Sequence, residues 1–240
     1  MSMDYRVWPS PHSLAVAAAE LVAAAIRTAV AARGRCRLAL AGGSTPVLLL
    51  RELSRPSYQQ LPWQSVSLFW SDERFVAPDH PDSNFRMVRE NLLAALAVKP
   101  EIYPISTAFD SPATAARAYE TVIDSAFAAA DREDNWPVFD CILLGVGTDG
   151  HTASLFPGDE ALAEIRRWTA AGRAPDGSPR VTLTLPLLNA ARQVLFLASG
   201  SGKAAIIAAL AGGADLPAAR VKAAKVLWLL DAAAAAHLPV

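Results

Sequence analysis

The chain contains the stretch Phe139-Asp140-Cys141-Ile142-Leu143-Leu144-Gly145-Val146-Gly147-Thr148-Asp149-Gly150-His151, an apolar run that ends in three glycines, an aspartate and a histidine. Adjacent Ile, Leu and Val residues, without polar residues between them, indicate a strand buried on both faces, as in a parallel sheet. The glycines allow the backbone to turn sharply and to approach a ligand closely. The stretch therefore delivers Asp149 and His151 to the carboxyl end of a strand, where open α/β sheets bind ligands.

Helical and strand patterns alternate on both sides of this stretch. We expect helices at 12–32, 46–53, 83–96, 113–130 and 204–211, a closing Ala-rich helix after residue 230, and strands at 36–41, 66–70, 102–105, 139–146, 180–185, 193–198 and 226–230. This order predicts an α/β fold, a mostly parallel sheet with helices on both faces. We expect one domain over residues 1–240, in which the segment 156–179 borders the site.

The composition excludes several classes of protein. Hydrophobic residues make up 52% of the 240 residues and charged residues 19%, which is typical of a folded globular chain. A net charge of −1 without a basic cluster gives no support to nucleic-acid binding. Charges or prolines interrupt the apolar stretches before they reach membrane-spanning length, and the N-terminus lacks the pattern of a signal peptide. We therefore expect a cytoplasmic protein, a monomer that binds neither membrane nor nucleic acid, with Cys36 and Cys141 as buried thiols rather than a disulfide.

Four predicted strand ends carry glycines or charges, and in a parallel sheet they meet at one edge. They are 42–45, 72–74, 145–151 and 199–203. Gly42-Gly43-Ser44-Thr45 opens a helix, with Ser44 or Thr45 as its predicted cap, and free amides at a helix N-terminus suit a phosphate. A tight turn with a helix cap is the alternative, since the segment lacks the lysine of a nucleotide-binding loop.

Two cations could complete an anion site at this edge. Lys203 follows the second glycine-rich turn, and Arg180 begins a strand. Together with a helix N-terminus they would hold a phosphate dianion well. A solvated surface charge is the alternative for each residue, and for Lys203 the spacing alone favours that alternative. Asp72 and Arg74 belong to a charge cluster at another strand end. Solvated loop charges are the default explanation of such a cluster, but its place at a strand end favours at least one contact with substrate.

His151 is the candidate proton-transfer residue, because histidine is the residue type best suited to proton transfer near neutral pH. Asp149 is placed to orient its imidazole. A structural cap of the turn is the alternative role for His151. A metal site is not favoured, because no second His or Cys stands nearby at ligand spacing.

The segments in this order resemble the 6-phosphogluconolactonase family. The matching pieces are Leu40 to Pro46, Ser71 to Arg74 with Asp82-Ser83-Asn84, Gly145 to Gly158, Arg180 to Leu183, Gly200 with Lys203, and Trp228 to Asp231. The resemblance covers nearly the whole chain and implies a Rossmann-like fold of the isomerase/lactonase type. The related glucosamine-6-phosphate isomerases carry a catalytic Glu where this chain has Phe156, and an apolar ring cannot transfer a proton. The resemblance therefore favours a lactonase over an isomerase or deaminase.

The resemblance also implies the reaction and the roles of the residues. The substrate would be 6-phospho-D-glucono-1,5-lactone of the oxidative pentose phosphate pathway, hydrolysed without metal or organic cofactor. His151 would be the general base, with Asp149 aligning it. The predicted substrate and phosphate contacts are Gly43, Ser44, Thr45, Asp72, Arg74, Arg180 and Lys203. A non-catalytic sugar-phosphate sensor on the same fold is a further alternative, but we find no DNA-binding segment.

Overall fold

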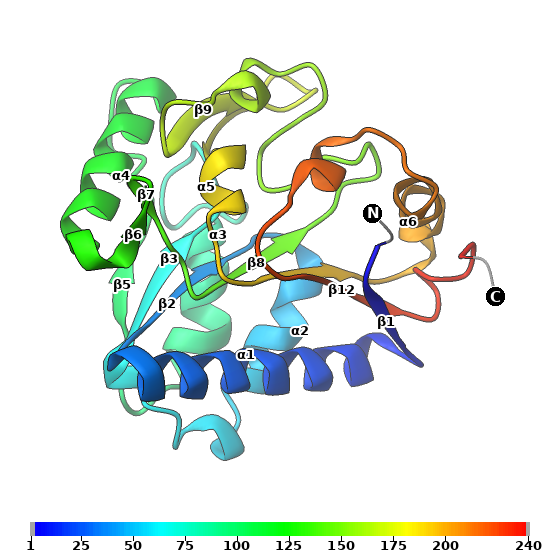
Figure 1. The fold of residues 1–240 in the computed structure, drawn as a ribbon, viewed down its shortest axis with the longest axis horizontal. Helices are drawn as coiled ribbons and strands as arrows, with labels where there is room; N and C mark the ends of the chain where they lie inside the picture. The colour runs from blue at the N-terminus through cyan, green and yellow to red at the C-terminus, as the bar shows by residue number, and fades with distance from the viewer. Residues whose placement is uncertain (1–2, 239–240) are drawn as a thin grey trace.

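Seven short strands form a parallel sheet at the centre of the fold (Figure 1). The computed structural model describes residues 3–238. The strand order is β1-β12-β11-β8-β2-β3-β5, and every neighbouring pair is parallel. The bounds are β1 (Tyr5–Trp8), β2 (Cys36–Leu40), β3 (Val66–Trp70), β5 (Glu101–Tyr103), β8 (Cys141–Gly145), β11 (Val194–Ala198) and β12 (Val226–Asp231). The predicted α/β class with a mostly parallel sheet is confirmed.

Helices cover both faces of this sheet. The bounds are α1 (Pro11–Arg33), α2 (Ser44–Leu53), α3 (Asn84–Val88), α4 (Pro112–Ala126), α5 (Leu185–Asn189) and α6 (Ala204–Ala211). In Figure 1, α1 and α2 lie on one side of the sheet, and α4, α5 and α6 lie on the other. Right-handed crossovers account for this division, because the chain crosses the sheet in one direction from β2 to β5 and in the other from β8 to β12.

Helix α1 is a core helix with an unusually small-residue face. Ser10 caps its N-terminus and Gly34, at φ 73°, ends it. Leu14, Val22 and Ile26 lie on its buried face, with alanines between them that let the helix approach the sheet closely. By length and composition alone α1 could cross a membrane, and it is the single helix in residues 3–238 of which this is true. Its apolar residues are instead part of the hydrophobic core beneath the sheet.

A second, antiparallel sheet stands at the carboxyl edge of the main one. It consists of β4 (Asp72–Arg74), β10 (Pro179–Leu183) and β9 (Thr169–Arg173), in that order. The strand expected at 180–185 therefore exists, but it does not belong to the central sheet. Its alternating pattern does not correspond to one exposed face, because Thr182 is as fully buried as its apolar neighbours Val181 and Leu183. A further hairpin joins β6 (Arg132–Glu133) to β7 (Trp136–Pro137).

Other expectations need correction at the ends of elements. The closing Ala-rich segment forms turns rather than a helix, because so short a helix gains little stability from helix propensity alone. Helix α4 ends at Ala126 instead of residue 130, since Phe127 adopts extended backbone and is buried. The helix expected at 83–96 is α3 followed by a π-helical turn at Arg89–Leu93. Strand β1 was not expected.

The two cysteines are free and buried, as predicted. Burial raises the pKa of the Cys141 thiol to about 12 and also raises that of Cys36. Both thiols are thus protonated and unreactive at neutral pH.

Candidate active site

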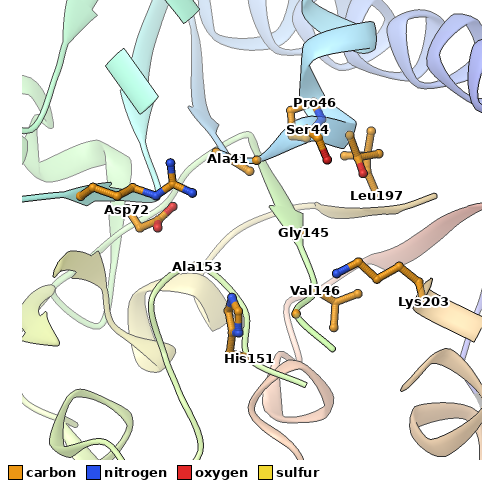
Figure 2. A pocket seen from close by; sticks show the side chains of 15 residues that line it. Ala41, Ser44, Pro46, Asp72, Gly145, Val146, His151, Ala153, Leu197 and Lys203 are labelled. Carbon is orange, nitrogen blue, oxygen red and sulfur yellow. The ribbon is translucent and has the colours of Figure 1, made fainter. Parts of the chain in front are cut away.

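A cavity of about 200 Å³ opens where the strand order reverses direction, between β2 and β8 (Figure 2). This is the position at which doubly wound sheets bind ligands. The cavity is lined by residues at or after the carboxyl ends of β2, β3, β8 and β11, namely Ala41 to Pro46, Asp72, Arg74, Gly145, Val146, Gly147, His151, Ala153, Leu197 and Lys203. The four predicted strand ends therefore do meet in one place.

The N-terminus of α2 forms one wall of the cavity. The N-cap of this helix is Gly43, at φ 98°, and no side chain caps it. The predicted caps, Ser44 and Thr45, are instead the first two residues of the helix, because the left-handed backbone that glycine accepts moves the helix start one residue earlier. The first amides of α2 and the positive end of its dipole are thus left for a ligand at this wall.

His151 lies on the opposite side of the cavity from Ser44 (Figure 2). Its Nδ1 is 2.6 Å from Oδ1 of Asp149, and its backbone N–H donates to the same oxygen at 3.1 Å. Burial acts to raise the pKa of Asp149, but the bonds and the charge of His151 outweigh it and the pKa is lowered. Asp149 is therefore an ionised acceptor, and its contact with Nδ1 favours the tautomer of the neutral imidazole in which Nδ1 carries the proton and Nε2 is an acceptor.

The shape of the turn depends on its glycines. A Cβ on Gly147 would stand 2.1 Å from Nδ1 of His151, so only glycine leaves room for the imidazole there. Gly150 has φ +82°, and a side chain at this position would collide with that of Leu216. The ring of Phe156 packs against the imidazole from the other side, with 4.3 Å between the ring centroids. The turn and this ring together hold His151 in place.

Lys203 reaches into the cavity from the turn that follows β11 (Figure 2). Burial lowers the pKa of Lys203 from its ordinary value of 10.5, and the charge of Asp149 opposes this shift. Within residues 3–238, Nζ of Lys203 has neither a hydrogen bond nor an ion pair to the protein. It is thus a half-buried cation available to an anion in the cavity.

Strand β4 supplies two further side chains to the cavity. Asp72 is buried and accepts a hydrogen bond from Oγ of Ser154 at 2.7 Å. Arg74 lines the cavity and donates from a guanidinium nitrogen to the carbonyl oxygen of Asp82 at 2.6 Å. Its other guanidinium donors have no partner within residues 3–238. Between them Glu73 points away from the cavity, where it accepts from the backbone amides of Asn84 and Phe85 at the start of α3.

Two of the predicted site residues do not line the cavity, namely Asp149, which contacts His151, and Arg180. Arg180 lies directly across from Arg74 in the β10–β4 pairing. Its guanidinium donates to Oγ of Ser178 at 2.8 Å and to the carbonyl oxygen of Pro179 at 3.1 Å. Burial and the charge of Arg74 lower its pKa. Arg180 is therefore near the site, but its side chain must rotate to reach an anion bound at α2.

Several buried residues that support the site were given no role by the sequence analysis. Asn84 donates through Nδ2 to the carbonyl oxygen of Asp72 at 2.9 Å, and its Oδ1 has no partner within residues 3–238. Its carboxamide fills the space beside Gly42, where a Cβ would lie 2.0 Å from Oδ1. Asp231 accepts from the turn that carries Lys203. Both residues stand in the motifs that carry the resemblance, which was the one available signal.

Nothing in the part of the chain from 3 to 238 groups three or more His, Cys, Asp or Glu side chains so that they could hold a metal ion. The cavity instead pairs an imidazole and carboxylate with a helix N-terminus and a lysine. This arrangement can bind an anion at one side and move a proton at the other.

Comparison of the sequence with known proteins agrees with this chemistry. The family model of "Glucosamine-6-phosphate isomerases/6-phosphogluconolactonase" matches residues 9–228. A 6-phosphogluconolactonase of Nostoc is 39% identical over the full length of both chains. The human 6-phosphogluconolactonase is 40% identical over 98% of this chain and 93% of its own.

Solved structures show the same architecture. A 6-phosphogluconolactonase from Trypanosoma brucei superposes with a TM-score of 0.88 at 29% identity, covering 99% of each of the two chains. One from Thermotoga maritima has a TM-score of 0.82 at 27% identity, over 95% of this chain and 99% of that one. A monomeric glucosamine-6-phosphate deaminase superposes with a TM-score of 0.81 at 22% identity, over 98% of this chain and all of its own, and shows the shared fold alone.

Proposed function

The chain belongs to the family of glucosamine-6-phosphate isomerases and 6-phosphogluconolactonases, and we propose that it hydrolyses 6-phospho-D-glucono-1,5-lactone to 6-phospho-D-gluconate in the oxidative pentose phosphate pathway. Full-length relatives of that name in bacteria and mammals support this reaction. The observation that carries the proposal is the position of His151, paired with Asp149, on the same small cavity as Ser44 and Lys203.

His151 acts as the general base. Its Nε2 removes a proton from a water molecule as that water attacks the lactone carbonyl carbon, and a positioned base of this kind contributes ~10²–10⁴-fold to the rate. Asp149 keeps the proton on Nδ1 and stabilises the imidazolium that forms. The imidazolium then returns a proton to the ring oxygen as the C–O bond breaks, so the base is regenerated within one cycle.

The tetrahedral intermediate places a negative charge on the former carbonyl oxygen, and Arg74 is the favoured group to stabilise it. The amides of Gly147 and Gly150 already donate within the turn, to the carbonyl oxygens of His151 and Gly147. Arg74 lines the cavity and has further guanidinium donors without a partner within residues 3–238. A preorganised cation in a partly desolvated site is an effective stabiliser of a developing oxyanion.

The 6-phosphate takes no part in the chemistry and serves to position the lactone. Gly43, Ser44 and Thr45 offer the amides and hydroxyls at the start of α2, and Lys203 offers a cation. Arg180 joins them after rotation of its side chain, and Asp72 accepts from a sugar hydroxyl. Binding energy from the phosphate then holds the carbonyl against the water and His151.

Isomerase or deaminase chemistry is not supported by the surroundings of His151. Phe156 is buried and its ring packs on the imidazole. A deaminase needs a second proton-transferring group at this place, and a phenyl ring has none. Lactone hydrolysis has no such requirement, because a single imidazole both takes and returns the proton.

The decisive experiment follows acid release from freshly generated 6-phosphogluconolactone, with plain gluconolactone and glucosamine 6-phosphate in parallel. We expect fast hydrolysis of the phosphorylated lactone, slow hydrolysis of the plain one, and no release of ammonia. His151→Ala should lower kcat by ~10²–10⁴-fold with little change in affinity, whereas the exposed His12→Ala serves as the control and should have wild-type kcat. Wild-type turnover by His151→Ala would remove this residue from the mechanism.

We also propose that the enzyme works as a cytoplasmic monomer without a cofactor. A single chain already brings all of the proposed substrate contacts to one cavity or its border. Size-exclusion chromatography with light scattering tests this, and a stable dimer at micromolar concentration would contradict it.

A further inference from the structure

We propose that Asp231 is a positioning residue for the phosphate site, because it holds the turn from which Lys203 reaches the cavity. The inference rests on the proposed function, in which Lys203 binds the 6-phosphate. Asp231 does not touch substrate in this proposal, and its effect is exerted through the backbone of residues 199–203.

The carboxylate of Asp231 is buried at the end of β12, with 1% of the residue exposed. Its Oδ2 accepts from Oγ of Ser199 at 2.7 Å, and both of its oxygens lie 3.0 Å from the backbone N of Gly200. Oδ1 also accepts from the backbone N–H of Ala234 at 2.7 Å. A carboxylate can only accept, so three donors converging on it match its chemistry well.

The sheet explains why Asp231 reaches this turn. Strands β11 and β12 run parallel, with Ala198 paired to Leu230. Ser199 follows Ala198 and Asp231 follows Leu230, so the two segments lie side by side where they leave the carboxyl edge of the sheet. The side chain of Asp231 thereby lies beside the first two residues of the turn.

The turn transmits this contact to Lys203. Gly200 has φ +91°, a conformation that costs most residues strain, and its amide is fixed by Asp231. The carbonyl oxygen of the same Gly200 accepts from the backbone N–H of Lys203 at 3.0 Å. One hydrogen bond therefore separates the residue that Asp231 holds from the residue that carries the cation.

Asp231 does not act on Lys203 through its charge. The acidic group whose charge acts on the lysine is Asp149, on the opposite turn. Asp231 forms no ion pair within the described residues 3–238, and its contacts are to neutral donors. Its contribution to phosphate binding is accordingly geometric.

The test is Asp231→Asn, which keeps the size of the side chain but turns one acceptor into a donor that faces Ser199 or Gly200. We expect the KM for 6-phosphogluconolactone to rise about tenfold, which corresponds to about 1.4 kcal/mol. The kcat and the slow hydrolysis of plain gluconolactone should stay within about twofold, since neither depends on Lys203. In a Lys203→Ala background the same substitution should leave KM unchanged, because the cation that it positions is gone.

Asp140→Asn is the matched control. Asp140 is also buried and accepts from the backbone N–H of Arg37 at 2.7 Å, but at the amino end of β8, away from the cavity. It should lower the Tm without changing KM. If Asp231→Asn fails to fold, Ser199→Ala removes a single donor to the same carboxylate and should raise KM in the same direction by less.

The proposal is overturned if Asp231→Asn lowers the Tm with KM unchanged, or if it raises KM equally with and without Lys203. Failure of the proposed function would look different, since the wild type would then not hydrolyse the lactone. In that case calorimetry with inorganic phosphate decides: binding weakened by Asp231→Asn only while Lys203 is present supports the positioning role, and equal effects in both backgrounds refute it.

Discussion

Oδ1 of Asp149 lies 2.6 Å from Nδ1 of His151 and also accepts the backbone N–H of that residue at 3.1 Å. One oxygen therefore fixes both the ring and the backbone of the same histidine. The imidazole, which lines the cavity, is 30% exposed and the carboxylate 38%, while the geometry of the pair is held from within the turn. This contact holds the imidazole in one orientation, as the proposed role of His151 as a general base requires.

Asp149→Asn should reduce kcat by about 10²–10⁴-fold while KM changes little. The amide can donate to Nδ1, which favours the wrong tautomer and leaves Nε2 protonated. Steady-state kinetics measure the effect, with circular dichroism as the control for folding. Because the pKa of Asp149 is already lowered from 3.8, the wild-type pH–rate profile should show no step from this group above about pH 4. An Asn variant with wild-type kcat would show that Asp149 does not act through the tautomer.

The affinity for 6-phosphogluconate should depend on pH through Lys203. Burial lowers the pKa of this lysine below 10.5, and only its charged form attracts a phosphate dianion. Affinity should thus hold below the lowered pKa and fall as the pH rises through it, before pH 10.5 is reached. Calorimetric titration across this range tests the prediction. Lys203→Ala should bind more weakly at every pH and lack this fall, and an identical fall in the variant would assign it to another group.

Gly42 and Asn84 should be energetically coupled, because the carboxamide occupies the place of a side chain at Gly42. Gly42→Ala should lower the free energy of unfolding by ~1–3 kcal/mol through overpacking. In an Asn84→Ala background, Gly42→Ala should lower the free energy of unfolding by less, and the difference, the coupling free energy, should be ~0.5–3 kcal/mol. Urea unfolding of the four proteins in the cycle measures it. Additive costs would mean that the loop moves away without resistance from Asn84.

Phe156→Ala should cost both stability and turnover. The ring is 6% exposed and packs on the imidazole. Its loss leaves a cavity, which should lower the free energy of unfolding by about 3–5 kcal/mol. The loss also frees His151 to move. Phe156→Leu retains most of the volume and serves as the milder control. Thermal unfolding and kcat measure the two effects. Unchanged turnover in Phe156→Ala would show that the glycine turn and Asp149 hold the imidazole without the ring.

The long apolar patterns were reliable guides because they depend on local backbone geometry. The helix expected at 12–32 is α1, and the buried run at 139–146 is the central strand β8. The closing alanines misled the prediction, since helix propensity alone does not stabilise so short a helix. Expectations of a single domain, a monomer and a cytoplasmic location stay predictions.

The sequence by itself determined most of the strands and helices along the chain, the glycine turn after β8 and the short-range pair of Asp149 and His151, because these follow from neighbours along the chain. Tertiary structure alone decided which distant groups share the cavity. The switch between β2 and β8 brings Ser44 and Lys203 to His151, whereas the pairing of β10 with β4 sets Arg180 opposite Arg74 and off the cavity wall. Tertiary structure also revealed the roles of the buried residues Asn84 and Asp231. Asn84 contacts the carbonyl oxygen of Asp72, and Asp231 contacts the backbone of Gly200. Local periodicity in the sequence does not predict contacts between residues so far apart.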